Sequence, residues 1–277
     1  KKINRRSFLA AAGLTAAALA LTACGGSASS TASSTASSAA SSEAASTSAA
    51  AELTTVEAGK LTMATNAAFP PYEMTTDAGE FEGIDIDTAK AIAEKLGLEL
   101  QIDDMDFDAA LLSVQQGKAD IVMAGVTVTD ERKAVMDFSD SYATGIQSII
   151  VPEGSDITSP DDLAGKKIGT QRGTTGYIYC SDDFGDDAVV AYDDGLTAVQ
   201  ALNNGQVDAV VIDNAPAKEF VAANPGLVIL DTSYAEEDYA IGLAKGSALE
   251  DAVNAALEEL KADGTLQSIV DKYITAE

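Results

Sequence analysis

The sequence contains few side chains that could carry out chemistry. Its 277 residues include no His and only two Cys, which excludes Ser-His-Asp and Cys-His catalytic sets, His-based metal sites and four-Cys zinc clusters. With 44 acidic and 17 basic residues, the net charge of −27 also argues against nucleic-acid binding, because phosphate contacts need clustered Lys and Arg. The 46% of apolar residues predict a folded body with a sizeable core.

Four aspartates, Asp85, Asp87, Asp106 and Asp108, are close enough in sequence to suggest a metal or acid-base site. Helix capping explains them better, since Asp85 or Asp87 can cap the helix that follows and Asp106 precedes the next one. Residues 173–176 (Gly-Thr-Thr-Gly) lack the Gly-Lys-Ser/Thr ending of a phosphate loop. We therefore expect no metal, no cofactor and no catalysis.

Arg132 is the residue most suited to recognition. Beyond residue 23 the chain has only two arginines, Arg132 and Arg172, and the first ends the segment 124–132, Ala-Gly-Val-Thr-Val-Thr-Asp-Glu-Arg. Thr129 is a plausible N-cap, which places Arg132 on the first turn of a helix. A planar guanidinium there can hold a carboxylate by two parallel hydrogen bonds. The alternative is a surface ion pair, and we expect Arg172 to be such a surface residue.

Short apolar runs alternate with amphipathic segments along the chain, which is typical of an α/β protein with sheets covered on both faces. The expected strands are 61–65, 98–102, 120–123, 146–151, 167–170, 188–192, 208–212, 228–230 and 239–244. The expected helices are 86–96, 107–116, 130–136, 160–164, 174–183, 195–204, 214–223, 248–262 and 265–274.

Two segments of the chain have similar sequences, and this similarity indicates how many sheets the protein has. Residues 114–123 and 202–211, at a constant offset of 88, both have the pattern helix, Gly, buried strand. Either this is shared turn chemistry, or the chain has two similarly wound α/β lobes. Ligands of open α/β sheets bind beyond the carboxyl ends of the strands, here residues 124–127 and Asp213. Two such edges facing each other predict a cleft between lobes.

The N-terminal residues have the features of an export signal. Basic residues in 1–6 precede an apolar run, and Leu-Thr-Ala-Cys-Gly at 21–25 resembles a bacterial lipobox, which implies cleavage before Cys24 and lipidation of its thiol. The alternative for Cys24 is an ordinary buried thiol. Arg5-Arg6 also resembles a twin-arginine signal, so the export route stays open.

Cleavage after residue 23 would leave 13 basic and 44 acidic residues, a net charge of −31. Residues 24–56, rich in Ser, Ala and Thr, then predict a flexible tether. Its root-mean-square span of roughly 30 Å would hold the body near the outer face of the cytoplasmic membrane. Cys180 would be the remaining thiol, and we expect it to be packed.

Seven segments, in this order along the chain, resemble those of one family. They are 64–73 (Ala-Thr-Asn-Ala-Ala-Phe-Pro-Pro-Tyr-Glu), 83–87 (Gly-Ile-Asp-Ile-Asp), 105–108 with 124–132, 137–140 (Asp-Phe-Ser-Asp), 165–175 and 208–213. From Lys60 to Tyr273 the chain is similar to the bacterial extracellular solute-binding proteins of polar amino-acid ABC transporters (family 3). The resemblance implies a monomeric binding protein that is not an enzyme and that delivers an amino acid to an ABC permease.

The resemblance also implies a two-lobed α/β fold of the periplasmic-binding-protein type (type II), with a ligand cleft between the lobes. We expect lobe 1 at 57–144 plus 238–277 and lobe 2 at 147–235, joined by two extended crossings that act as a hinge.

Site residues follow from the same resemblance. Phe69 and Phe107 would sandwich the ligand side chain, Gly125 and Thr127 would bind its ammonium or its carboxylate, and Arg132 would clamp the carboxylate. In lobe 2, Thr174 would help to hold the carboxylate with Thr175 close by, and Asp213 would meet the α-ammonium. The full expected set is Asn66, Phe69, Phe107, Ala124, Gly125, Thr127, Arg132, Gln171, Thr174, Thr175 and Asp213.

The expected ligand class depends on the residues near the tail of the ligand, which is the end of its side chain. In relatives that bind basic amino acids, the position of Asn66 often carries Asp or Glu. Here Asn66, Thr127 and Gln171 are uncharged, which favours a neutral polar ligand, glutamine foremost, with arginine or lysine second. Three carboxylates, Glu73, Asp106 and Asp108, lie near enough in sequence to reach the tail and favour a cation instead.

Two other functions stay open from the sequence. One is a secreted enzyme on the same fold, such as a dehydratase, with Asp213 or Glu73 as general acid. The other is a sensor that binds an amino acid and passes the signal to a partner.

Overall fold

The computed structural model describes residues 53–274. The predicted signal segment 1–23, Cys24 and most of the predicted tether lie outside these residues, so those interpretations stay predictions. In the described part, none of the helices combines the length and apolar character needed to cross a membrane.

Lobe 1 is built on a five-stranded mixed sheet. Its strand order is β5 (Glu99–Asp104), β1 (Lys60–Thr65), β6 (Ile121–Val122), β14 (Gly242–Ala244) and β7 (Met136–Phe138). The first three strands are parallel, and β14 runs antiparallel to both of its neighbours. Helices α1 (Ile84–Leu96), α7 (Glu250–Ala262) and α8 (Thr265–Tyr273) pack together beside it, and α2 (Phe107–Gln115) packs against β1 and β14.

A three-stranded sheet belongs to the same part of the chain and carries two pocket residues. It consists of β2 (Ala68–Phe69), β3 (Glu73–Thr75) and β4 (Phe81–Glu82). The short helix α3 (Asp130–Lys133) follows β6. The sequence pattern did not indicate the small sheet because its strands have only two or three residues.

Lobe 2 is built on a second sheet. Its strand order is β10 (Val189–Tyr192), β9 (Ile168–Gln171), β11 (Ala209–Asp213), β8 (Ala143–Pro152) and β12 (Leu227–Ile229), and β13 (Ala235–Tyr239) pairs with β8. Helices α4 (Thr175–Phe184), α5 (Gly195–Asn203) and α6 (Asn214–Ala223) pack against it. The 3₁₀ turn η1 (Pro160–Leu163) precedes β9, and the 3₁₀ turn η2 (Asp186–Ala188) packs against α4. One apolar cluster contains Leu202 and Phe220, and a second contains the fully buried Cys180. Cys180 is thus packed, as expected.

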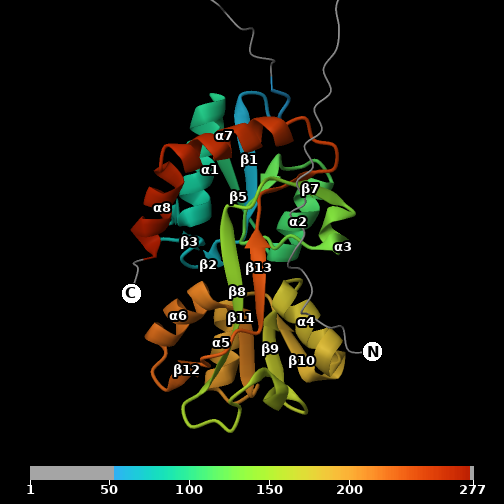
Figure 1. The fold of residues 1–277 in the computed structure, drawn as a ribbon, viewed down its shortest axis with the longest axis vertical. Helices are drawn as coiled ribbons and strands as arrows, with labels where there is room; N and C mark the ends of the chain where they lie inside the picture. Colours follow the sequence, from blue (N-terminus) through green and yellow to red (C-terminus); the bar gives the residue numbers. More distant parts are fainter. Residues whose placement is uncertain (1–52, 275–277) are drawn as a thin grey trace, which may run out of the picture. The chain divides into compact units, whose positions relative to one another are not determined.

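Two antiparallel strands connect the lobes. β8 and β13 pair from Ala143 with Tyr239 to Gln147 with Ala235, and Figure 1 shows them side by side, extending from the sheet of lobe 2 toward lobe 1. The two-lobed α/β expectation is confirmed. Residues 143–147 and 235–239 belong to the connecting strands, where the proposed lobe boundaries fall, and those boundaries stay a proposal.

Candidate functional site

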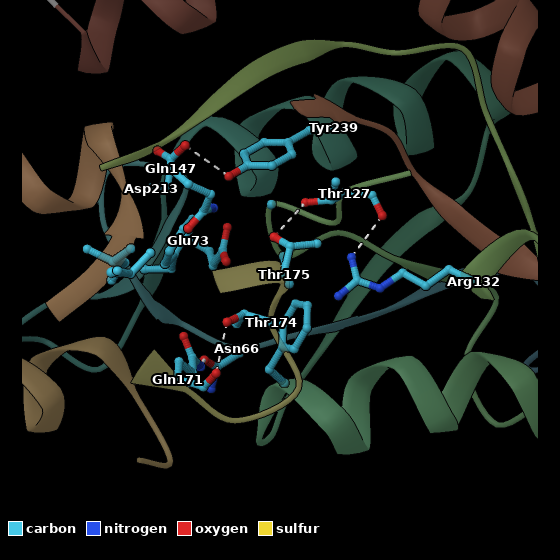
Figure 2. Close-up of a pocket in the computed structure, with 16 residues that line it drawn as sticks. Asn66, Glu73, Thr127, Arg132, Gln147, Gln171, Thr174, Thr175, Asp213 and Tyr239 are labelled. Atoms are coloured by element: carbon cyan, nitrogen blue, oxygen red, sulfur yellow. Dashed lines mark hydrogen bonds between the residues drawn. The ribbon is translucent and has the colours of Figure 1, made fainter. Parts of the chain in front are cut away.

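A pocket of about 440 Å³, its open mouth included, lies where the two lobes meet (Figure 2). A cleft between two lobes is a common place for a small-molecule site. All eleven residues expected from the sequence line it: Asn66, Phe69, Phe107, Ala124, Gly125, Thr127, Arg132, Gln171, Thr174, Thr175 and Asp213. The walls also include Glu73, Gln147, Val211, Ile212 and Tyr239.

Arg132 is held in place by two carbonyl groups. Thr129 caps α3, as predicted, by accepting a hydrogen bond from the Arg132 backbone N–H at 3.2 Å. The guanidinium donates to the carbonyl of Thr127 (2.8 Å) and, across the cleft, to that of Gly173 (3.1 Å), and it lies 5.4 Å from the centre of the Phe107 ring.

The charge of Arg132 has no direct partner in the part of the chain that is described. The side chain is buried, and no carboxylate there forms an ion pair with it. Burial lowers the pKa of Arg132, and the negative charge of Glu237 opposes that change. A buried cation with donors left over is a site for an anionic group of a ligand.

Asp213 ends β11 and is the N-cap of α6. Its carboxylate accepts hydrogen bonds from the backbone N–H groups of Ala215 (2.9 Å) and Ile146 (2.8 Å) and from the Tyr239 hydroxyl (3.0 Å). Burial raises the pKa of Asp213 to about 6. Two carboxylate oxygens have about four acceptor sites, so one is left for a donor in the pocket.

The first turn of α4 closes the pocket from lobe 2. Thr174 caps this helix by accepting from the Tyr177 N–H at 3.4 Å, and its hydroxyl donates to the Gln171 carbonyl at 2.8 Å. The hydroxyl of Thr175 lies 3.4 Å from that of Thr127 in lobe 1. Backbone N–H groups at a helix N-terminus favour negative charge, so this end also suits a carboxylate.

Two amides meet at another part of the pocket. The Gln171 amide donates to Asn66 Oδ1 at 2.8 Å and to the Asp193 carbonyl at 3.2 Å, while the Asn66 amide donates to the Met105 carbonyl at 3.0 Å. This polar wall is uncharged.

An aromatic ring approaches the backbone of lobe 1. Phe69 stacks on Tyr72 with 5.8 Å between ring centres. A Cβ on Gly125, whose φ is +55°, would lie 2.9 Å from the Phe69 ring, so Gly125 allows this approach.

Glu73 is a buried acid in the pocket wall. It is fully buried, and no N–H or hydroxyl group among residues 53–274 donates to its carboxyl oxygens, but the Asp85 carboxyl lies close enough to share a hydrogen bond with it when one of the two is protonated. Burial raises the pKa of Glu73 well above its usual value, and the neighbouring carboxylate of Asp85 raises it further. A group in this state either takes up a proton or pairs with a cation.

The four aspartates that suggested a metal site do not gather in one place. Asp85 is buried and accepts from the Gly125 N–H at 3.0 Å, while Asp87 pairs with Lys272 at 2.7 Å. Asp106 and Asp108 border a separate hollow beside Arg172. Neither Asp85 nor Asp87 is the N-cap of α1, which is Gly83, so the capping expectation was wrong for both.

The reason lies at Gly83. A Cβ there would lie 2.2 Å from the Tyr72 carbonyl oxygen, which only glycine avoids. Gly83 therefore lies against the backbone of Tyr72, just before β3. Asp85, on the first turn of α1, is buried as a result. Arg172 is exposed, as expected, and pairs with Asp193 at 3.6 Å.

Sequence reasoning missed four lining residues, Gln147, Val211, Ile212 and Tyr239, and named Glu73 only as an alternative general acid and as one of three carboxylates that could reach the ligand tail. Val211 could have been found, because residues two apart on a strand share a face and Asp213 was already a candidate. Gln147 and Tyr239 come from the two connecting strands, and no motif marked them.

Comparisons with known proteins identify the family of the chain. The model of the family "Bacterial extracellular solute-binding proteins, family 3" matches residues 61–276. A "Probable histidine-binding protein" of Neisseria gonorrhoeae is 32% identical, over 99% of this chain and 98% of that protein. The arginine-binding extracellular protein ArtP of Bacillus subtilis is 33% identical, over 79% and 87%.

Solved structures show the same fold. An ancestral arginine-binding protein bound to glutamine superposes with a TM-score of 0.75 at 43% identity, covering 79% of this chain and 99% of that one. The arginine-bound form of an ancestral arginine-binding protein gives a TM-score of 0.74 at 43% identity, with 78% and 98% covered. This chain therefore belongs to the bacterial extracellular solute-binding proteins of family 3.

Proposed function

We propose that this protein binds a polar L-amino acid between its lobes and delivers it to the membrane subunits of an ABC transporter. The observation that carries the proposal is the placement of Arg132 and Asp213 in one pocket, on different sides in Figure 2. Arg132 is a buried guanidinium without an ion-pair partner among the described residues, and Asp213 is a buried carboxylate with acceptor capacity left. Together they complement the carboxylate and ammonium groups of a zwitterion.

Two side-chain classes fit the remaining walls. Asn66 and Gln171 supply uncharged donors and acceptors, which favours glutamine. The carboxyl of Glu73 receives no hydrogen bond from a described N–H or hydroxyl group and supports arginine as a second candidate, since an ionised Glu73 could pair with a guanidinium. In protonated form, Glu73 could instead donate a hydrogen bond to a neutral amide. The ancestral arginine-binding proteins provide a precedent, because the glutamine-bound and arginine-bound structures both resemble this chain.

Closure around the ligand is part of the proposal. Lobe 1 contributes Arg132 and Thr127, and lobe 2 contributes Asp213 and Thr175, so a ligand that contacts all four favours the closed arrangement. The hinge would lie in β8 and β13. Lipidation at Cys24 would keep the binding unit at the outer face of the cytoplasmic membrane.

A thermal-shift panel of the twenty amino acids tests the proposal. Stabilisation by glutamine, arginine or both supports it, because a ligand that binds only the folded state raises the melting temperature. Stabilisation by arginine or lysine alone would overturn the preference for glutamine. No shift with any of them would contradict amino-acid binding and favour the enzyme reading, in which Asp213 or Glu73 acts as general acid. Co-purification with permease subunits separates transport from sensing.

A further inference from the structure

Glu237 is a buried acid in β13, one of the two strands that connect the lobes. Only 6% of its surface is exposed, although its neighbours Glu236 and Asp238 are exposed. Its Oε2 atom accepts hydrogen bonds from the Thr127 hydroxyl and from the Gln147 amide, both at 3.0 Å. Glu237 itself is not among the pocket-lining residues, but both of its donors are. Glu237 therefore contacts the pocket wall through Thr127 and Gln147.

The contact with Thr127 fixes the direction of a hydroxyl group. A threonine hydroxyl has one proton to donate, and a carboxylate can only accept. Because the Thr127 proton points to Glu237, the same oxygen presents only lone pairs to its other neighbours. The contact at 3.4 Å between the Thr127 and Thr175 hydroxyls must then take its proton from Thr175. The hydrogen bonds therefore run in one direction, from lobe 2 through Thr127 to the connecting strand.

The polarity of Thr127 decides which ligand group can lie beside it. An ammonium group has donors only, so it gains from an acceptor, whereas a carboxylate would face lone pairs and be repelled. Arg132 lies on the other side of the same residue and donates to the Thr127 carbonyl at 2.8 Å. Glu237 also contributes negative charge near the buried guanidinium without pairing with it.

We propose that Glu237 is a positioning residue that turns the Thr127 hydroxyl into an acceptor for the α-ammonium group of the ligand. The inference rests on the proposed function, because it assumes an amino-acid ligand in this pocket. It also resolves the alternative that the sequence left open for Thr127, in favour of the ammonium over the carboxylate. Orientation follows: the carboxylate lies toward Arg132 and the ammonium between Asp213 and Thr127.

The replacement Glu237→Gln tests this with little change in size. A glutamine side chain no longer has to accept here: its NH2 group can donate to Thr127, and its neutral oxygen holds the Thr127 proton less tightly than a carboxylate does, so the proton is no longer fixed away from the ammonium. We expect the Kd for L-glutamine or L-arginine, whichever the wild type binds, to rise about tenfold or more, as for a lost hydrogen bond to a charged group. Glu237→Asp keeps a carboxylate and should lose less.

A double-mutant cycle separates positioning from a structural role. In a Thr127→Val background no hydroxyl is left to orient, so adding Glu237→Gln should change the Kd less than about twofold, well below the single-mutant effect. An equal loss in both backgrounds would show that Glu237 only supports the fold. No loss in the wild-type background would also overturn the proposal.

The matched control is Glu236→Gln, which removes the same charge from the exposed neighbour on the same strand. It should leave the Kd within about twofold, because exposed charges outside a site contribute little. Melting of each ligand-free variant shows whether it is folded, and Glu237→Asp serves if Glu237→Gln is not. If the wild type binds no amino acid, the proposed function fails before any variant is compared, so the two failures are distinguishable.

Discussion

The Gln171 amide nitrogen donates to Asn66 Oδ1 across the cleft at 2.8 Å. The Asn66 amide nitrogen also has a partner, because it donates to the Met105 carbonyl. The bond joins the end of β9 in lobe 2 to the loop after β1 in lobe 1, so it forms only when the lobes are together. Both side chains are uncharged. They line the pocket at the place where, in the proposed complex, the ligand side chain would end.

Replacing Asn66 with Asp should move ligand preference toward cations. A carboxylate there forms charge-assisted hydrogen bonds with arginine, worth about 1.5 to 3 kcal/mol, or roughly ten- to a hundredfold in affinity. Calorimetry with arginine and glutamine on both proteins measures the ratio of the two Kd values. Asn203→Asp adds the same charge at an exposed position of α5 and should leave the ratio unchanged. An unchanged ratio in Asn66→Asp would mean that the side chain ends elsewhere.

Removing the Arg132 guanidinium should abolish most of the affinity. Loss of one partner from a buried charge pair costs about 3 to 5 kcal/mol, which is at least about a hundredfold in Kd. Arg132→Lys keeps the charge but not the paired donors and should fall between wild type and Arg132→Ala. Calorimetry suits this comparison because the chain has no Trp.

The control for Arg132 is Arg172→Ala, which removes the other arginine of residues 24–277, one that is exposed. It should bind as wild type does. Binding by Arg132→Ala within about threefold of wild type would place the ligand carboxylate elsewhere.

Pocket residues within continuous motifs could be predicted from the sequence. The segment 124–132 follows one strand and caps the next helix, so its residues lie at one sheet edge in any fold of this kind. Asp213 ends a strand in the same way. Local pattern and sheet geometry suffice for such residues.

The side of the site formed by the two connecting strands could not be predicted in this way. Glu237 stands in the acidic run Glu236-Glu237-Asp238, which is typical of a solvated segment, and the expected strand began only at Tyr239. Pairing with β8, about ninety residues earlier, buries Glu237 and places it against Gln147 and Thr127. Nothing local to the run encodes that register, because it depends on a distant strand.

Cys24 should carry the lipid anchor. Metabolic labelling with a clickable fatty acid is expected to mark the wild type and to be lost in Cys24→Ala. Cys180→Ala is the matched control, because it removes the other cysteine, which is buried in lobe 2, and should keep the label. Retention of the label by Cys24→Ala would rule out this site of attachment.

Ligand affinity should fall as the pH drops through about 6. Burial raises the pKa of Asp213 to about 6 in the ligand-free protein, and an ammonium group binds its ionised form. Below that pH a proton must leave Asp213 before the ligand can pair with it, so the Kd rises by up to about tenfold per pH unit. Between pH 7 and pH 5 we expect an increase of about tenfold, measured by calorimetry in one buffer series.

Two variants assign this pH dependence. Asp213→Asn should bind more weakly at pH 7 and show a flatter profile, with any remaining slope attributable to Glu73 and Asp85, whose pKa values are also raised by burial. Asp208→Asn changes an exposed aspartate just before the other end of β11 and should keep the wild-type profile. If Asp213→Asn retained both the affinity and the slope of the wild type, the ammonium would not lie at Asp213. The inferred orientation would then lose one of its two acceptors, because it places the ammonium group between Asp213 and Thr127.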